Sequence, residues 1–62
     1  MSLADLMFER DLNDTQLARL SGVSRTAIQR YRTGERSTVT MQLGTAVKLA
    51  EALGCEPVDL LP

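Results

Sequence analysis

Arginine is the residue type whose distribution in this chain points most directly to chemistry. Five arginines fall between positions 19 and 36 of the 62-residue sequence: Arg19, Arg25, Arg30, Arg32 and Arg36. Glu35 is the single acidic residue among them, so the segment carries a local net charge of +4. The guanidinium group presents a planar fork of N–H donors that matches phosphate oxygens or the O6 and N7 acceptors of guanine. The segment therefore suits contacts to a nucleic acid, with a solvated helix face as the alternative.

The charge of the whole chain conceals this segment, because the formal total is −1. Outside positions 19–36 the chain has two basic and seven acidic residues, a net charge of −5. A nucleic-acid function thus requires a fold that turns the arginine segment toward the ligand and the acidic remainder away from it.

Reactive side chains of other kinds are scarce. The chain has no histidine, and Cys55 is its one cysteine. Because there is no metal-ligand cluster, no glycine-rich phosphate loop and no base next to Cys55, we expect neither an enzyme nor a cofactor, metal or small-molecule site. We interpret Cys55 as a small packed side chain, the alternative being a reactive thiol.

A cytoplasmic location is expected from the cysteine content and the hydropathy. One cysteine forms no disulfide within the chain, which fits a reducing compartment. No apolar run approaches the ~20 residues that span a bilayer, and the N-terminus lacks the pattern of a signal peptide. We therefore expect no association with a membrane.

Cap residues and apolar spacing predict one all-α domain over residues 1–62. Four helices and a short fifth are expected at about 3–10, 14–20, 25–32, 41–53 and 57–61. Ser2, Asn13 and Ser24 are candidate N-caps of the first three helices, and Gly34 suits the end of the third. The stretch 37–40 is expected to be a loop.

The apolar residues of the fourth helix define its expected buried face. They recur at helical spacing as Leu43, Val47, Ala50 and Leu53, reinforced by Ala46 and Leu49.

The second and third helices are separated by Ser21, Gly22 and Val23. Gly22 permits a positive φ and hence a sharp bend, and the small Ala18 allows the two helices to approach closely. Leu17, Val23, Ile28 and Tyr31 are expected to share one core, although an exposed Tyr31 would suit stacking on a base. Such a turn leaves the second helix free to enter a major groove.

The run QLARLSGVSRTAI, from Gln16 to Ile28, resembles the core of the lambda-repressor-like helix-turn-helix domains of phage Cro and repressor proteins and their bacterial relatives. The run KLAEALG, from Lys48 to Gly54, resembles the end of that family's fourth helix. The resemblance covers roughly residues 3–61. It implies an all-α domain of four to five helices that binds double-stranded DNA on the nucleoid of a bacterial or phage-infected cell.

The resemblance also implies roles for individual residues. Four are expected to read bases from the third helix: Ser24, Arg25, Thr26 and Arg30. Five are expected near the DNA backbone, the last three just after the helix: Arg19, Gln29, Arg32, Thr33 and Arg36. Alternatives remain open for Arg25 as a phosphate contact, for Arg30 and Arg19 as solvated side chains, and for Gln29 as an adenine reader.

The chain departs from the family's pattern at three places. Asp14 stands where a phosphate-holding glutamine is common at the start of the second helix, and its carboxylate would repel the DNA backbone. The loop after Gly34 is about three residues longer than usual and carries Glu35 where a basic residue is common. The first helix is short.

Two functions follow from these observations. The first is a small transcriptional regulator, a Cro-like repressor that occupies its operator as a homodimer through the C-terminal residues Val58, Leu60 and Leu61 and exposed parts of the fourth helix. The alternative is a protein-interaction module, an adaptor or antitoxin-like partner, that keeps the fold without binding specific DNA.

Overall fold

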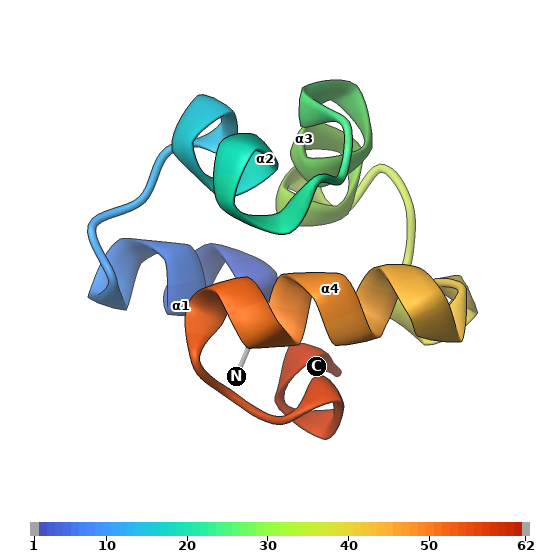
Figure 1. Cartoon of the computed structure of the whole chain (residues 1–62). Coiled ribbons are helices and arrows are strands. Elements are labelled where there is room, and N and C mark those ends of the chain that lie inside the picture. The colour runs from blue at the N-terminus through green and yellow to red at the C-terminus, as the bar shows by residue number, and fades with distance from the viewer. Residues whose placement is uncertain (1, 62) are drawn as a thin grey trace.

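A computed structural model describes residues 2–61, which form an all-α fold with no strand in this part of the chain. Four α-helices and two 3-10 turns follow one another as α1 (Leu3–Glu9), α2 (Asp14–Ser21), α3 (Arg25–Thr33), η1 (Thr38–Thr40), α4 (Leu43–Leu53) and η2 (Pro57–Leu60). Figure 1 shows α2 and α3 side by side over α1 and α4, with η2 on the far side of α4. None of the helices within residues 2–61 is long and apolar enough to cross a membrane.

The starts of the first three helices are fixed by local hydrogen bonds, as the cap residues predicted. The Ser2 hydroxyl accepts from the Asp5 N–H at 3.2 Å, and the Asn13 side chain accepts from the Gln16 N–H at 2.8 Å. The Ser24 hydroxyl accepts from the Ala27 N–H at 3.2 Å. These bonds satisfy amide donors that the helix itself leaves without partners.

The core is aliphatic and lies where the helices meet. Its buried members come from every α-helix and from η2: Leu3, Leu6, Met7, Leu17, Ile28, Leu49, Leu53 and Leu60. Leu17 in α2 and Ile28 in α3 are fully buried, so these two side chains fix the pair of helices against α1 and α4. At one end of the core, Arg10 Nε donates to the Leu53 carbonyl at 2.7 Å and ties α1 to the end of α4.

The expected buried face of α4 is wrong at two positions. Leu43 is 75% exposed and Val47 is 36% exposed, whereas Leu49, Ala50 and Leu53 are buried. The buried residues of α4 all lie in the second half of the helix, which packs against α2 and η2. Leu43 and Val47, one turn apart, therefore lie on its outer flank.

The segments flanking α4 also differ from expectation. The stretch 37–40, expected as a loop, contains the η1 turn, whose start is capped by the Ser37 hydroxyl accepting from the Val39 N–H at 3.2 Å. The short terminal helix is the 3-10 turn η2. The expectation that Leu60 helps form a dimer surface is wrong, because Leu60 is 2% exposed and belongs to the core of its own chain.

Candidate nucleic-acid interface

The turn between α2 and α3 is closed by hydrogen bonds around Gly22. Gly22 has φ +77°, in the left-handed region, and its N–H donates to the Ala18 carbonyl at 2.9 Å. Ser21 Oγ donates to the Leu17 carbonyl at 2.7 Å and accepts from the Val23 N–H at 3.1 Å. An added Cβ at Gly22 would meet nothing within 4 Å, so the backbone conformation, rather than space, explains this glycine.

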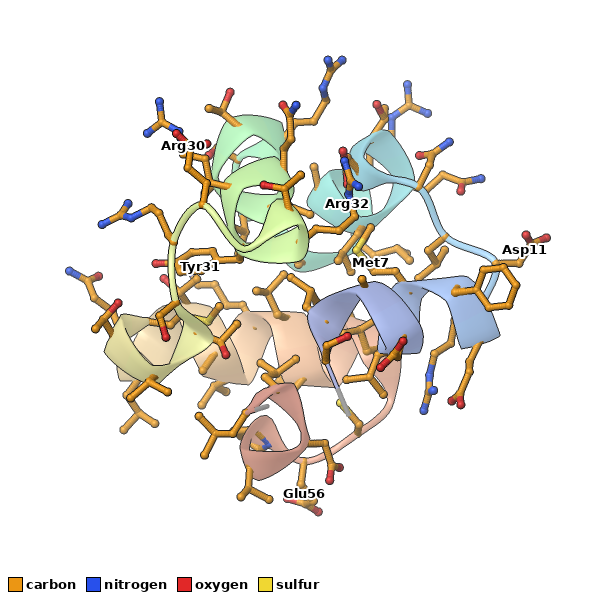
Figure 2. All side chains as sticks on the ribbon, turned by 180° about the vertical axis from the view of Figure 1, so that it is seen from behind. Met7, Asp11, Arg30, Tyr31, Arg32 and Glu56 are labelled. Carbon is orange, nitrogen blue, oxygen red and sulfur yellow. The ribbon has the colours of Figure 1, made fainter. Side chains whose placement is uncertain are left out.

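One face of α3 points entirely to solvent. Its residues recur at helical spacing and are all exposed: Arg25, Thr26, Gln29, Arg30 and Thr33. The opposite face carries Ile28, which is buried in the core, the partly buried Tyr31, which packs against the core, and the partly buried Ala27. In Figure 2, Arg30 projects from the body of the molecule, while Tyr31 lies beneath it toward α4. We call the five exposed residues the α3 face; Ser24 stands at its N-terminal end.

The cations around the α3 face differ in how they are held. Arg30 Nε lies 4.0 Å from the Glu35 carboxylate, and both side chains are at least half exposed, so this pair is weak. Arg36 lies over the Tyr31 ring, 5.6 Å from its centroid, in cation–π geometry. Arg19 is exposed in the last turn of α2. Within residues 2–61, neither Arg19 nor Arg25 forms an ion pair.

Arg32 is the exception, because its guanidinium is bound to Asp14. Arg32 Nε donates to Asp14 Oδ1 at 2.7 Å, and Nη2 donates to Oδ2 at 2.9 Å. This bidentate pair joins the last turn of α3 to the first residue of α2. The hydrogen bonds to Asp14, and then the charge of that carboxylate, raise the pKa of Arg32 above its ordinary value.

The Asp14–Arg32 pair changes the expected electrostatics of this side of the molecule. We expected an isolated Asp14 carboxylate to repel DNA, but the carboxylate is neutralised by an arginine that we had assigned to the backbone set. The sequence did not predict this pair, because its two members are 18 residues apart. Arg32 and Thr33 also lie within the last turn of α3, rather than just after the helix.

The structure brings most of the candidate residues together. The proposed base readers Arg25, Thr26 and Arg30 share the α3 face with Gln29 and Thr33. Arg36 follows in the loop after Gly34, Arg19 lies on α2, and Arg32 is turned toward α2. Figure 2 shows Asp11 and Glu56 well away from Arg30, so Glu35 is the acidic side chain that an ion pair places beside the α3 face in the part of the chain that the structure describes.

Two side chains with possible chemistry lie outside this face. Tyr31 is partly buried and packs against the core, in agreement with the core interpretation. Cys55 is also partly buried on the core; burial, and then the charge of Asp59, raise the pKa of its thiol, while Arg10 has the opposite effect. A protonated, packed thiol fits the structural interpretation of Cys55.

Comparison with known proteins identifies the family. A family model described as a Cro/C1-type HTH DNA-binding domain matches residues 2–62. No curated protein and no solved structure gives a significant match.

Proposed function

We propose that this chain, which belongs to the Cro/C1-type helix-turn-helix DNA-binding domain family, is a sequence-specific repressor that reads duplex DNA with the α3 face. The observation that carries the proposal is the exposure of that face. Arg25, Thr26, Gln29 and Arg30 point to solvent from a helix that Ile28 anchors in the core. A rigid helix with free polar side chains along one side is what major-groove reading requires.

Base reading is assigned to the first turns of α3. Arg25 and Arg30 can each donate two hydrogen bonds to guanine O6 and N7, and Ser24 and Thr26 carry hydroxyls near the helix start. Contacts to the sugar-phosphate backbone are assigned to residues around the rim of this face: Arg19, Gln29, Arg32, Thr33 and Arg36. Arg32 contacts the backbone with the N–H groups of its guanidinium that do not donate to Asp14.

Repression by operator occupancy needs more contact than one helix provides. A single small module buries too little surface for tight specific binding, so we propose that two copies bind neighbouring half-sites about 34 Å apart. Bound at a promoter in the cytoplasm, such a dimer blocks polymerase by occupying the operator.

The test starts with selection of bound sequences from a random duplex pool, which yields the motif and the half-site spacing. Arg30→Ala is then expected to weaken binding to the selected site by about 1–3 kcal/mol and to relax the preference at one base pair. Lys48→Ala is the matched control, because Lys48 is an exposed cation on α4, away from the α3 face. Equal affinity and equal base preference for Arg30→Ala and the wild type would remove Arg30 from the reading set.

The same selection separates the two candidate functions. An enriched motif supports a repressor. The absence of any enriched sequence, together with recovery of a protein partner, would favour the interaction module.

A further inference from the structure

Glu35 is held beside Arg30, one of the residues proposed to read bases from α3. The Glu35 carboxylate oxygen Oε2 lies 4.0 Å from Arg30 Nε. This distance is too long for a hydrogen bond, but the opposite charges attract each other across it. The Nη1 and Nη2 groups of Arg30 form no hydrogen bond within residues 2–61, so their N–H donors are available to a ligand.

The backbone around Glu35 fixes its place next to α3. The helix ends at Gly34, which has φ +84° in the left-handed region, and the Gly34 N–H donates to the Tyr31 carbonyl at 3.4 Å. The Arg36 N–H then donates to the Arg30 carbonyl at 3.1 Å. Because both neighbours of Glu35 are hydrogen-bonded to α3, its carboxylate is kept within reach of the Arg30 side chain.

The other nearby cation does not compete for Glu35. Arg36 follows it in the chain, but the Arg36 guanidinium lies over the Tyr31 ring, 5.6 Å from its centroid. Glu35 forms no second ion pair in the part of the chain that the structure describes. Its side chain is 68% exposed and that of Arg30 is 50% exposed, so the pair contributes little to the stability of the free protein. Its effect is expected in a complex with DNA, which displaces water from the two charges and strengthens their interactions.

An arginine at the surface of DNA can bind either a phosphate or the major-groove edge of guanine. A carboxylate beside the guanidinium repels the negatively charged phosphate, whereas the guanine edge carries no net charge. Guanine O6 and N7 accept two hydrogen bonds, which Nη1 and Nη2 of Arg30 can supply while Nε faces Glu35. The carboxylate of Glu35 therefore disfavours the phosphate contact more than the guanine contact.

We propose that Glu35 is a positioning residue, which directs the Arg30 guanidinium to guanine and away from the phosphates. The proposal rests on the proposed function, because it requires that Arg30 reads a base. The Glu35 carboxylate lowers the affinity for every DNA, but it lowers the affinity least where Arg30 meets guanine. Glu35 thus acts on the preference for the selected site over other DNA, rather than on how tightly that site is bound.

The experiment uses Glu35→Gln, which removes the charge and keeps the size of the side chain. Binding is measured to the selected site, to the same site with the base pair that Arg30→Ala identifies replaced, and to an unrelated duplex of equal length. The variant is expected to bind the unrelated duplex roughly two- to fivefold more tightly than the wild type, with a change of less than about twofold at the selected site. The ratio of these two affinities should therefore fall, and replacing the base pair should weaken binding less than it does in the wild type.

The controls separate positioning from a general effect of charge. Glu51→Gln removes an equal charge from an exposed carboxylate on α4 and should leave the ratio unchanged. Adding Glu35→Gln to Arg30→Ala should not lower the ratio further, since Glu35 acts through Arg30, and circular dichroism should show that every variant folds. A ratio in Glu35→Gln equal to that of the wild type, or a fall of equal size with and without Arg30, would overturn the proposal. A wild type that prefers no sequence would instead overturn the proposed function.

Discussion

The Asp14–Arg32 pair predicts the salt dependence of DNA binding. Of the five arginines in the basic segment, Arg32 alone is held bidentately by a carboxylate, at 2.7 and 2.9 Å. The other four arginines keep their charge at the DNA surface and displace counterions whether they end on a base edge or on a phosphate, so we count four such cations per copy, or about eight per bound pair. The logarithm of the affinity should then fall with the logarithm of the salt concentration at a slope of about −7.

Asp14→Asn removes the carboxylate charge and leaves the shape of the side chain nearly unchanged. Arg32 then becomes a fifth cation per copy, and the expected slope steepens to about −9. Between 50 and 200 mM salt, the wild type should lose about 10⁴-fold in affinity and the variant about 10⁵-fold. At low salt the variant should bind DNA more tightly than the wild type.

Fluorescence anisotropy titrations at four salt concentrations measure these slopes. Glu51→Gln is the control, because Glu51 is an exposed carboxylate on α4 that forms no ion pair within residues 2–61, and its slope should match the wild type. Adding Arg32→Ala to Asp14→Asn should return the slope to about −7. A slope for Asp14→Asn equal to that of the wild type, in a variant that circular dichroism shows to be folded, would refute the reasoning.

Three further predictions concern stability and the thiol. Gly44→Ala should raise the free energy of unfolding by about 0.5–1 kcal/mol, because Gly44 lies in a helix and its new Cβ meets nothing within 4 Å, whereas Gly22→Ala should lower it by about 1 kcal/mol, because φ there is +77°. Thermal melts of the two variants that shift in the same direction would contradict this. Leu17→Ala should cost about 3 kcal/mol, most of the stability of so small a domain, and a urea midpoint within error of the wild type would show that Leu17 does not anchor α2. Because burial raises the pKa of the Cys55 thiol, the folded state keeps its proton at a pH where the unfolded chain has lost it, so stability should fall as the pH rises from the unfolded toward the folded pKa. In urea titrations, Cys55→Ala should lack this decline in stability at alkaline pH. An identical decline in both proteins would show that another group causes it.

Features of the fold that depend on residues close together in the chain could be predicted from the sequence. Ser2, Asn13 and Ser24 start their helices through hydrogen bonds to residues three positions away, which a linear sequence makes visible. The α3 face could be predicted for the same reason, since helical spacing alone places Arg30 one turn after Thr26.

Features that depend on the angle between helices could not be predicted in this way. The partnership of Asp14 with Arg32 exists because the turn at Gly22 brings the start of α2 to the end of α3. The exposure of Leu43 depends on which part of α4 the neighbouring elements cover, which periodicity within α4 does not specify.

The α3 face also bears on how such a regulator can change over generations. Within residues 2–61, the side chains of Arg25, Thr26 and Gln29 form no hydrogen bond or ion pair with the rest of the chain. Ser24 differs, because its hydroxyl caps α3. Substitutions at Arg25, Thr26 and Gln29 therefore leave folding almost untouched, so under the proposed function duplicated copies of the gene can acquire new DNA targets by a few codon changes. Ser24 is constrained by the helix that it starts.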